Sequence, residues 1–255
     1  MSDNKTIDIS RHNAEINENL ISWNKKKILR QIYYEFFKNI KYHINLNIDG
    51  VILEIGSGIA KIKDIIPSCI CTDIFNNPWI DRVESAYKLS FKDKSVTNII
   101  LFDVFHHIEY PANALKEFNR VLKKDGRLII FDPCMSLLGL LVYGIFHNEP
   151  INIFKKINQN VVSDEIAINS DYYAAQGNAY RIFNNKVKYS YLLKEWKLLS
   201  INRYSSISYV ASGGFSKPKL YPDSFYSFVK IIDRLCDFFP LIFATRMLIV
   251  LKKQG

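Results

Sequence analysis

The sequence has few cysteines, and none of them stands in a spacing typical of a metal site. The four are Cys69, Cys71, Cys134 and Cys236. They form no C-x-x-C pair, and no histidine lies at zinc-finger spacing from them. This pattern is typical of reduced, buried thiols rather than of a disulfide framework. We therefore expect a cytoplasmic protein without a bound metal ion.

The chain also lacks long apolar runs. Residues 1–19 are polar and have no apolar segment of the kind found in a secretory signal. The longest apolar run, from Met135 to Phe146, is shorter than the roughly 20 residues that span a bilayer. A second apolar segment, from Phe238 to Leu251, is interrupted by Arg246. We expect a soluble protein, with peripheral contact to a membrane left open.

Clustered charge is missing as well, although the chain is basic. The 34 lysines and arginines against 25 acidic residues give a formal net charge of +9. The basic residues are scattered in small groups such as Lys123-Lys124, without a dense basic arm. Scattered charge is typical of a solvated surface, which argues against nucleic acid as a partner. A phosphate-bearing substrate or an anionic membrane surface stays possible.

Apolar runs and helical periodicity alternate along the first half of the chain. Val51 to Ile55 is a run suited to a buried parallel strand, and Gly56-Ser57-Gly58 follows it directly. The other expected strands are Ile70 to Ile74, Ser95 to Asp103 and Arg127 to Phe131; the expected helices are Leu20 to Tyr42 and Pro111 to Lys123, the second ended by Gly126. This alternation predicts an α/β fold, a doubly wound parallel sheet with helices on both faces.

The alternation stops after Pro133. Residues 134–190 show no clear period. Two closing strands are expected at Glu195 to Tyr204 and Ala244 to Lys252, with an aromatic helix from Asp223 to Phe239 between them. The aromatic side chains of residues 204–243 are expected mainly in the core. If some of them are exposed, they offer stacking faces for a sugar or an apolar face for a lipid.

The glycine turn after the first strand is the most informative motif. Glycines 56 and 58 let the backbone turn sharply and approach a ligand. A dinucleotide site needs a third glycine where this chain has Lys61, which argues against that cofactor. Glu54 supplies negative potential suited to a sulfonium group. Asp73 ends the second strand, where a carboxylate can hold a ribose diol.

These residues belong to a longer pattern. It consists of V-I-L-E-I-G-S-G (51–58), T-D-I (72–74), A-Y-K-L-S-F-K-D-K-S (86–95), D-V-F-H-H-I (103–108) and R-V-L-K-K-D-G-R-L-I-I (120–130). In order and spacing it resembles the class I S-adenosylmethionine methyltransferases, small-molecule branch. The resemblance implies a Rossmann-like sheet of seven strands whose last strand is antiparallel, and S-adenosylmethionine as the cofactor.

The resemblance also implies the cofactor-binding residues. They are Glu54, Gly56, Ser57, Gly58, Asp73, Ile74, Ser85, Ala86 and Asp103. The glycines would lie against the methionine part, Asp73 would hold the ribose and Ile74 would pack on the adenine. Ser85 departs from the family, which usually has an acid there, so the adenine contact is differently made.

Four regions follow from this alignment of motifs. We expect an N-terminal helical cap (1–45), a cofactor-binding α/β core (46–133), a substrate lid insert (134–192), and closing strands with the inserted aromatic helix (193–255).

Histidines near the expected acceptor side are the candidate catalytic residues. His107 follows the fourth strand, where an H-H pair occurs in the family and mostly shapes the loop. In the lid insert, His147-Asn148-Glu149-Pro150 places a histidine near a carboxylate that can orient it, or both can bind polar groups of the substrate. The candidates are therefore His147, Glu149 and His107. His12 and His43 show no partner in the sequence.

The acceptor follows less directly. Residues 143–150 and 211–222 resemble segments of a bacterial methyltransferase subgroup linked to cell-surface polysaccharide and lipid assembly. We expect a small-molecule or sugar- or lipid-linked acceptor, methylated on a hydroxyl or, alternatively, on nitrogen. An RNA methyltransferase is disfavoured because Asp103-Val104-Phe105-His106 stands where base-methylating enzymes have an N/D-P-P-Y tetrad. A non-catalytic binding module is the remaining alternative, and the oligomeric state is open.

Overall fold

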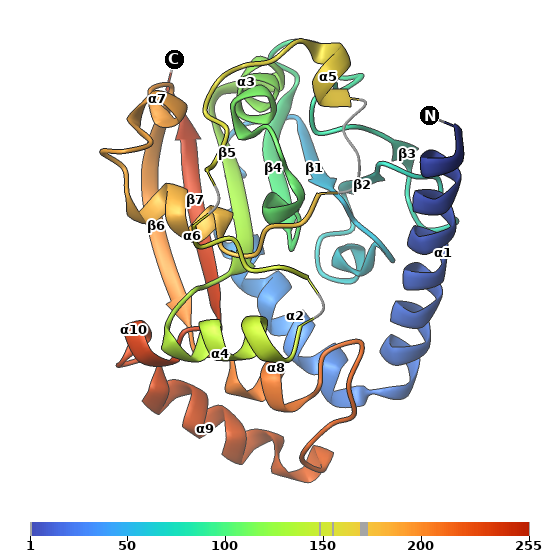
Figure 1. Cartoon of the computed structure of the whole chain (residues 1–255), viewed down its shortest axis with the longest axis vertical. Coiled ribbons are helices and arrows are strands. Elements are labelled where there is room, and N and C mark those ends of the chain that lie inside the picture. Colours follow the sequence, from blue (N-terminus) through green and yellow to red (C-terminus); the bar gives the residue numbers. More distant parts are fainter. Residues whose placement is uncertain (1, 148, 155, 169–172, 255) are drawn as a thin grey trace.

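A seven-stranded sheet with helices on both faces forms the centre of the molecule (Figure 1). The structure is a computed structural model and describes residues 2–147, 149–154, 156–168 and 173–254. Asn148 of the predicted H-N-E-P motif lies outside the described residues, as do parts of the predicted lid insert.

The sheet confirms the predicted fold class. Its strands are β1 (Val51–Ile55), β2 (Cys69–Asp73), β3 (Arg82–Val83), β4 (Val96–Phe102), β5 (Leu122–Pro133), β6 (Trp196–Tyr204) and β7 (Arg246–Lys253). They are ordered β3-β2-β1-β4-β5-β7-β6. β1 to β5 pair in parallel, whereas β7 runs antiparallel to β5 and β6. The last strand is thus the antiparallel one, as predicted; the two-residue strand β3 was not predicted.

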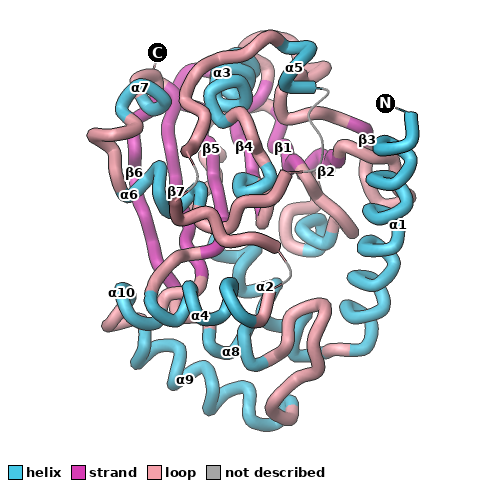
Figure 2. The backbone as a smooth tube through the Cα atoms, in the orientation of Figure 1, coloured by secondary structure: helices cyan, strands magenta, loops and turns pink. Residues whose placement is uncertain are grey.

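Thirteen helical elements surround the sheet in the described parts of the chain. The α-helices are α1 (Ser2–Lys25), α2 (Lys27–Tyr42), α3 (Pro111–Val121), α4 (Leu137–Ile145), α5 (Asp164–Ile168), α6 (Asn178–Asn184), α7 (Ser190–Leu193), α8 (Ile207–Ala211), α9 (Tyr226–Cys236) and α10 (Pro240–Phe243), and the 3₁₀ turns are η1 (Lys61–Asp64), η2 (Phe105–His107) and η3 (Asp223–Phe225). Figure 2 shows them as the cyan segments around the magenta strands.

Two hydrophobic cores lie on the two faces of the sheet. Leu53 and Ile55 of β1 pack into one core together with Phe118 of α3. Their neighbour Ile52 packs into the other core, with Phe36 of α2. Side chains alternate between the faces of a strand, so an uninterrupted apolar strand is suited to cores on both sides. In Figure 1, α2 accordingly crosses behind the strands, while α3 and α6 lie in front.

The N-terminal helical region consists of two helices rather than the single helix predicted from Leu20 to Tyr42. Lys26 separates α1 from α2 with an extended backbone, at φ −102° and ψ 94°. Its Nζ donates to the carbonyl oxygens of Gly214 and Lys217, each at 2.5 Å. After this break α2 crosses behind the sheet, whereas α1 runs along the edge formed by β2 and β3 (Figure 1). Apolar periodicity continues across the break, which is why the sequence did not reveal it.

The end of α3 is a second correction. The helix ends at Val121 and β5 begins at the next residue, so Gly126 lies inside a strand rather than after a helix. A Cβ at Gly126 would stand 2.9 Å from the carbonyl oxygen of Lys123 and 3.1 Å from that of Thr97. The glycine thus allows close approach of backbone, while Asp125 takes the left-handed conformation at φ 62°.

The C-terminal aromatic region is more exposed than predicted. The single helix expected from Asp223 to Phe239 is divided into η3 and α9, which ends at Cys236, and α10 follows beyond that range. The aromatic side chains split into two groups. Those packed against the core are Tyr204, Tyr209, Phe215, Tyr221 and Tyr226, and those exposed are Phe225, Phe228, Phe238 and Phe239. The prediction of an aromatic core is therefore wrong for the second group.

None of the helices in the described ranges has both the length and the apolar character needed to cross a membrane.

Candidate active site

The predicted cofactor residues meet at one edge of the sheet. β1 and β4 are neighbours in the sheet, and the chain continues outward from them in opposite directions. In open α/β sheets ligands bind at the carboxyl ends of the strands, at this switch point. Gly56 directly follows β1, Asp73 is the last residue of β2, and Asp103 directly follows β4.

Both glycines of the turn after β1 have left-handed backbones. Gly56 has φ +71°, and a Cβ there would stand 2.4 Å from Cγ2 of Val104. Gly58 has φ +52°, and its Cβ would meet only Cδ1 of Ile16, at 3.7 Å. Gly56 is therefore required by packing, whereas a Cβ at Gly58 would make an ordinary van der Waals contact with Ile16. Between them, Ser57 Oγ accepts the backbone N–H of Thr72 at 3.0 Å, which ties the turn to β2.

Asp73 lies beside this turn. Its Oδ2 accepts the N–H of Gly58 at 2.9 Å, and its Oδ1 accepts the N–H of Ile74 at 2.7 Å. His12 of α1 lies against the same carboxylate, with Nε2 3.3 Å from Oδ1. The hydrogen bond to Asp73 raises the pKa of His12. The expectation that His12 has no partner is wrong, because α1 packs across the end of β2.

Glu54 lies in β1, two residues before the glycine turn, and is buried. Its Oε2 accepts the thiol of Cys71, with Sγ at 3.5 Å. Burial raises the pKa of Glu54 well above its ordinary value, which favours the neutral acid. In the register of β1 and β2, Glu54 pairs with Cys71, two residues before Asp73. The role of Glu54 as a source of negative potential stays a prediction.

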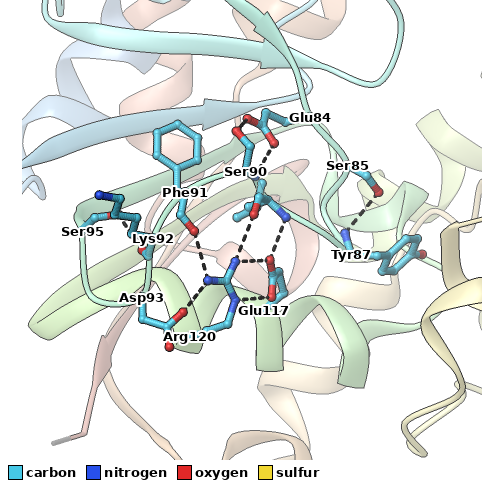
Figure 3. A network of polar contacts seen from close by, with 11 residues as sticks. Glu84, Ser85, Tyr87, Ser90, Phe91, Lys92, Asp93, Ser95, Glu117 and Arg120 are labelled. Carbon is cyan, nitrogen blue, oxygen red and sulfur yellow. Dashed lines mark hydrogen bonds and ion pairs between the residues drawn. The ribbon is translucent and has the colours of Figure 1, made fainter.

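The predicted adenine-contacting segment is fixed by a polar network (Figure 3). Arg120 of α3 donates to the carbonyl oxygens of Leu89 and Phe91, both at 3.0 Å, and pairs with Glu117 at 2.6 Å. Ser85 Oγ accepts the N–H of Tyr87 at 3.3 Å.

The remaining adenine-side residues are accessible. Ser85 and Ala86 are half-buried, and Ile74 is exposed over half of its surface. This exposure leaves an apolar side chain available to a flat ring. Glu84 does not replace the acid that the family has at position 85, because its carboxylate is bonded to Ser90 N–H at 2.8 Å.

Asp103 lies on the other side of the switch point. Its backbone is left-handed at φ 56°, an uncommon conformation for a non-glycine residue. Its carboxylate pairs with the buried Arg246 of β7. The guanidinium carbon of Arg246 also stands 4.4 Å from the ring centre of Tyr209. The structure thus directs the Asp103 carboxylate toward β7, and its role in binding the cofactor stays a prediction.

His106, which directly precedes the predicted His107, is held between two carboxylates. Its Nδ1 lies 2.9 Å from Oδ1 of Asp132, and its Nε2 lies 3.3 Å from Oε2 of Glu149. Burial alone would lower the pKa of His106, but the two carboxylates raise it to about 10. The imidazole is therefore a cation near neutral pH and links the end of β5 to the insert.

His107 and Glu149, two of the three predicted catalytic residues, meet beside it. His107 Nε2 lies 3.6 Å from Oε1 of Glu149. His107 Nδ1 lies 3.0 Å from the carbonyl oxygen of Tyr173. Burial and the neighbouring His106 lower the pKa of His107 to about 4. Gln176 Nε2 donates to Oε2 of Glu149 at 2.5 Å and orients the carboxylate.

The same three side chains are also close enough to share a cation. Ligand atoms of His106, His107 and Glu149 lie within 4.8 Å of one another. Sequence spacing gave no sign of this cluster, because Glu149 comes from a distant segment.

His147, the third predicted catalytic residue, lies at the rim of this group. Its Nδ1 is 3.9 Å from Oε2 of Glu149 and accepts the backbone N–H of that residue at 3.3 Å. Its ring packs against Tyr143 of α4, with centres 5.8 Å apart. Burial lowers the pKa of His147. The side chain is 42% exposed, considerably more than that of His106.

Sequence reasoning missed four residues that build the site. They are His12, Asp132, Gln176 and Arg246. Asp132 could have been found, because it closes a strand in the same way as Asp73. The other three come from segments whose position depends on tertiary packing, so no local signal marks them.

The residues at the strand ends fit S-adenosylmethionine. The cradle at Gly58, where a Cβ would meet only Ile16 at 3.7 Å, and the Asp73 carboxylate beside it suit a ribose diol next to a closely approached backbone. The site lacks the third glycine of a dinucleotide turn, since Lys61 starts η1.

Comparisons with known proteins agree with this fit. Residues 64–130 match the family described as "Methyltransferase domain". The match spans just over a quarter of the chain and begins after the glycine turn. No curated protein sequence matches the chain.

Solved structures with the same fold are methyltransferases and their relatives. A chain of the complex between the Haloferax volcanii methyltransferase activator Trm112 and a methyltransferase is 10% identical, with a TM-score of 0.56 and 97% of both chains covered. A Thermotoga maritima S-adenosylmethionine-dependent methyltransferase, described as a possible histamine N-methyltransferase, is 15% identical, with a TM-score of 0.54 and 94% and 99% covered. Geranyl diphosphate C-methyltransferase from Streptomyces coelicolor is 11% identical, with a TM-score of 0.52 and 88% and 80% covered.

At these identities the structural likeness establishes the fold. Residues 64–130 match a methyltransferase domain, and the solved structures that share the fold include S-adenosylmethionine-dependent methyltransferases.

Proposed function

We propose that this chain is an S-adenosylmethionine-dependent methyltransferase that acts on a hydroxyl group whose proton is accepted by His107, with Glu149 beside it. The observation that carries the proposal is the convergence of His107 and Glu149 at 3.6 Å, from the loop after β4 and from the insert. A hydroxyl benefits from a general base in methyl transfer, whereas an amine needs less help. This arrangement therefore favours oxygen over nitrogen as the methylated atom.

The residues divide into a cofactor side and an acceptor side. When bound, S-adenosylmethionine supplies a methyl carbon to the acceptor oxygen, and the electron pair of the broken carbon–sulfur bond stays on the sulfur of S-adenosylhomocysteine. Gly58 admits the cofactor close to the backbone, and Asp73 accepts hydrogen bonds from the ribose diol. Positioning of this kind can account for much of the rate in a displacement.

On the acceptor side, the hydrogen bond from His107 Nδ1–H to the Tyr173 carbonyl leaves Nε2 as the proton-accepting atom. Nε2 takes the hydroxyl proton as the new oxygen–carbon bond forms. Glu149 favours the resulting imidazolium, against the burial and the His106 charge that lower the pKa of His107, and the protonated His106 holds Glu149 in place. His147 packs at the rim and helps to position Glu149.

We propose a sugar- or lipid-linked molecule as the acceptor. The resemblance of residues 143–150 and 211–222 to the bacterial subgroup linked to cell-surface polysaccharide and lipid assembly supports this class. So do the exposed apolar helices near the site. Residues 134–192, proposed as the substrate lid, supply Glu149 and Gln176 to the catalytic cluster. We place the reaction in the cytoplasm.

His107→Gln and Glu149→Gln test the catalytic pair. We expect kcat to fall about 100-fold in His107→Gln and at least about tenfold in Glu149→Gln, because base catalysis typically contributes about 10²–10⁴-fold. The dissociation constant for S-adenosylhomocysteine should stay within about twofold of wild type, since neither residue is on the cofactor side. Labelled-methyl incorporation into cell-envelope extract measures turnover, and calorimetry measures binding.

His147→Gln is the matched control, and we expect a smaller loss of turnover. Wild-type turnover in both test variants would overturn the base assignment. Turnover that is abolished by a chelator and restored by one divalent cation would also overturn it, and would assign His106, His107 and Glu149 to the cation.

A further inference from the structure

Three short helices expose an unusual number of large apolar side chains. The set, which we call the apolar end, consists of Leu137, Leu141 and Ile145 on α4, Phe228, Ile231 and Leu235 on α9, Phe238 after α9, and Leu241 on α10. These helices lie at the lower end of the molecule in Figures 1 and 2. α10 packs against α4, and Ser136 Oγ donates to the carbonyl oxygen of Ile242 at 3.1 Å.

α9 turns its apolar side outward. Phe228, Ile231 and Leu235 recur at helical spacing and are all more than half exposed. The buried residues of the helix are Val229 and the carboxylate Asp233. A surface helix of a soluble protein normally buries its apolar stripe, so α9 has the reverse orientation. Contiguous apolar surface of this kind marks an interaction site.

α4 shows the same feature. Its sequence contains no charged residue, and its buried residues are Gly139 and Tyr143. Leu137, Leu141 and Ile145 follow one another at intervals of four and are exposed. The buried side of α4 is firmly anchored, because Tyr143 donates to the carbonyl oxygen of Thr245 at 2.9 Å. The exposed leucines therefore belong to an ordered helix.

Among the charged residues that accompany the apolar end, Arg234 is the exposed one. Between residues 226 and 243, all described, the charged residues are Lys230, Asp233, Arg234 and Asp237. Asp233 accepts from Ser208 N–H at 3.0 Å, and Asp237 accepts from Ser205 N–H at 2.6 Å, so both carboxylates are bound inward. Arg234 is exposed, and Lys230 is partly exposed while paired with Asp233 and Glu35.

We propose that the apolar end docks on a lipid bilayer whose surface carries anionic headgroups. Apolar side chains accompanied by an outward cation, here Arg234, suit such a surface. A symmetric dimer through the same surface would bring Arg234 of both copies into one interface without an outward carboxylate of α9 to face it. Charge complementarity therefore favours the bilayer over a second copy of the chain.

Docking at this end brings the catalytic cluster close to the bilayer. Tyr143, on the inner side of α4, packs against His147 at 5.8 Å, and His147 borders Glu149. An acceptor anchored by an acyl or prenyl chain could thus present its polar head to the site. This consequence for the acceptor class rests on the proposed function, whereas the docking itself does not.

Vesicle co-sedimentation tests the docking. We expect the full chain to bind vesicles of phosphatidylglycerol and phosphatidylcholine at least about fivefold more tightly than pure phosphatidylcholine, with the difference reduced at high salt. The double variant Phe228→Ser/Leu235→Ser should lose at least about tenfold in partitioning, because two exposed apolar side chains no longer insert. The matched control Leu46→Ser/Val187→Ser removes two apolar residues elsewhere that are even more exposed, and it should bind as wild type.

Equal binding of the double variant and the control would overturn the proposal, as would the absence of vesicle binding. A dimer of the wild-type chain in light scattering, with a monomer in Phe228→Ser/Leu235→Ser, would also overturn the proposal. The apolar end would then be an interface between two copies of the chain. The affinity of the same variants for S-adenosylhomocysteine distinguishes failure of the docking proposal from failure of the proposed function. It should be unchanged, because neither residue lies at the strand ends.

Discussion

At the scale of single residues, Asp73 has two competing tasks. In the described structure its carboxylate contacts His12, and in the proposed reaction it holds the ribose. The hydrogen bond to Asp73 raises the pKa of His12 from the usual 6.5. Protonation of His12 therefore favours the arrangement in which His12 contacts Asp73. Its stabilising contribution is complete below pH 6.5 and is lost as pH rises through the raised pKa.

The cofactor affinity of the wild type should therefore increase with pH. We expect S-adenosylhomocysteine to bind about two- to fivefold more tightly at about pH 8.5 than at about pH 6, as expected for loss of one partly exposed ion pair. His12→Gln should remove this dependence. Calorimetry across the pH range is the measurement, and parallel pH profiles for the two proteins would contradict the competition between His12 and ribose.

The two glycines of the turn should respond differently to substitution. Gly56→Ala combines a left-handed alanine with a contact of 2.4 Å to Val104, so it should destabilise the fold by about 2–4 kcal/mol. Gly58→Ala carries only the conformational penalty, about 1–2 kcal/mol, yet its Cβ fills the cofactor cradle and should weaken binding. Urea unfolding and calorimetry separate the two effects. If the two substitutions lowered the free energy of unfolding equally, the Val104 side chain would have moved aside to accept the new Cβ at position 56.

The difference between Asp73 and His12 shows what the sequence can reveal at this scale. Asp73 was predictable because it ends an apolar strand at a fixed distance from the glycine turn. His12 lies in a polar helix, and only the packing of α1 across β2 brings it to the carboxylate. A residue positioned by its own strand is visible in a sequence, whereas one positioned by tertiary packing is not.

At the scale of elements, the break between α1 and α2 determines where α1 lies. Lys26 bonds two carbonyl oxygens of the loop that precedes α9, and Ser22 Oγ donates to a third, that of Phe215, at 2.5 Å. These three hydrogen bonds, rather than helix propensity, direct α2 behind the sheet and leave α1 against β2. Most strands were predictable to within about two residues because apolar runs end where turns begin, but β5 begins at Leu122, five residues before the predicted Arg127, and β3 was missed. The helix break was not, since its cause is far away in the sequence.

Lys26→Ala should loosen α1. Removal of two charge-assisted hydrogen bonds should lower the free energy of unfolding by about 1–3 kcal/mol, reduced toward the lower end by partial exposure. Hydrogen exchange of α1 should increase more than that of α2, which is held by its buried face. Lys27→Ala, at the exposed neighbouring lysine, is the control. The tethering role would be refuted by equal exchange rates in the two variants.

At the scale of the whole molecule, one topology serves two sets of residues. The carboxyl ends of β1 and β2 carry the cofactor side, while the ends of β4 and β5 carry Asp103, His106 and Asp132. The parallel sheet was predictable from alternating apolar segments, and its seven strands and antiparallel β7 from the family resemblance. The insert was not, because its segments have no regular period. Its contribution of Glu149 and Gln176 is visible only in three dimensions.

Because a ligand that binds only the native state shifts the unfolding equilibrium, cofactor binding at the strand ends should stabilise the entire fold. A ligand that binds only the native state at 100 times its dissociation constant adds about 2.7 kcal/mol. For a chain of this size, that should raise the Tm by about 5–10 °C. Differential scanning calorimetry with S-adenosylhomocysteine measures the shift. Asp73→Ala should show a much smaller shift at the same concentration, because its loss of a charge-assisted hydrogen bond weakens binding by about 1.5–3 kcal/mol. An equal shift in Asp73→Ala would remove Asp73 from the site and leave the glycine turn as the main determinant of binding.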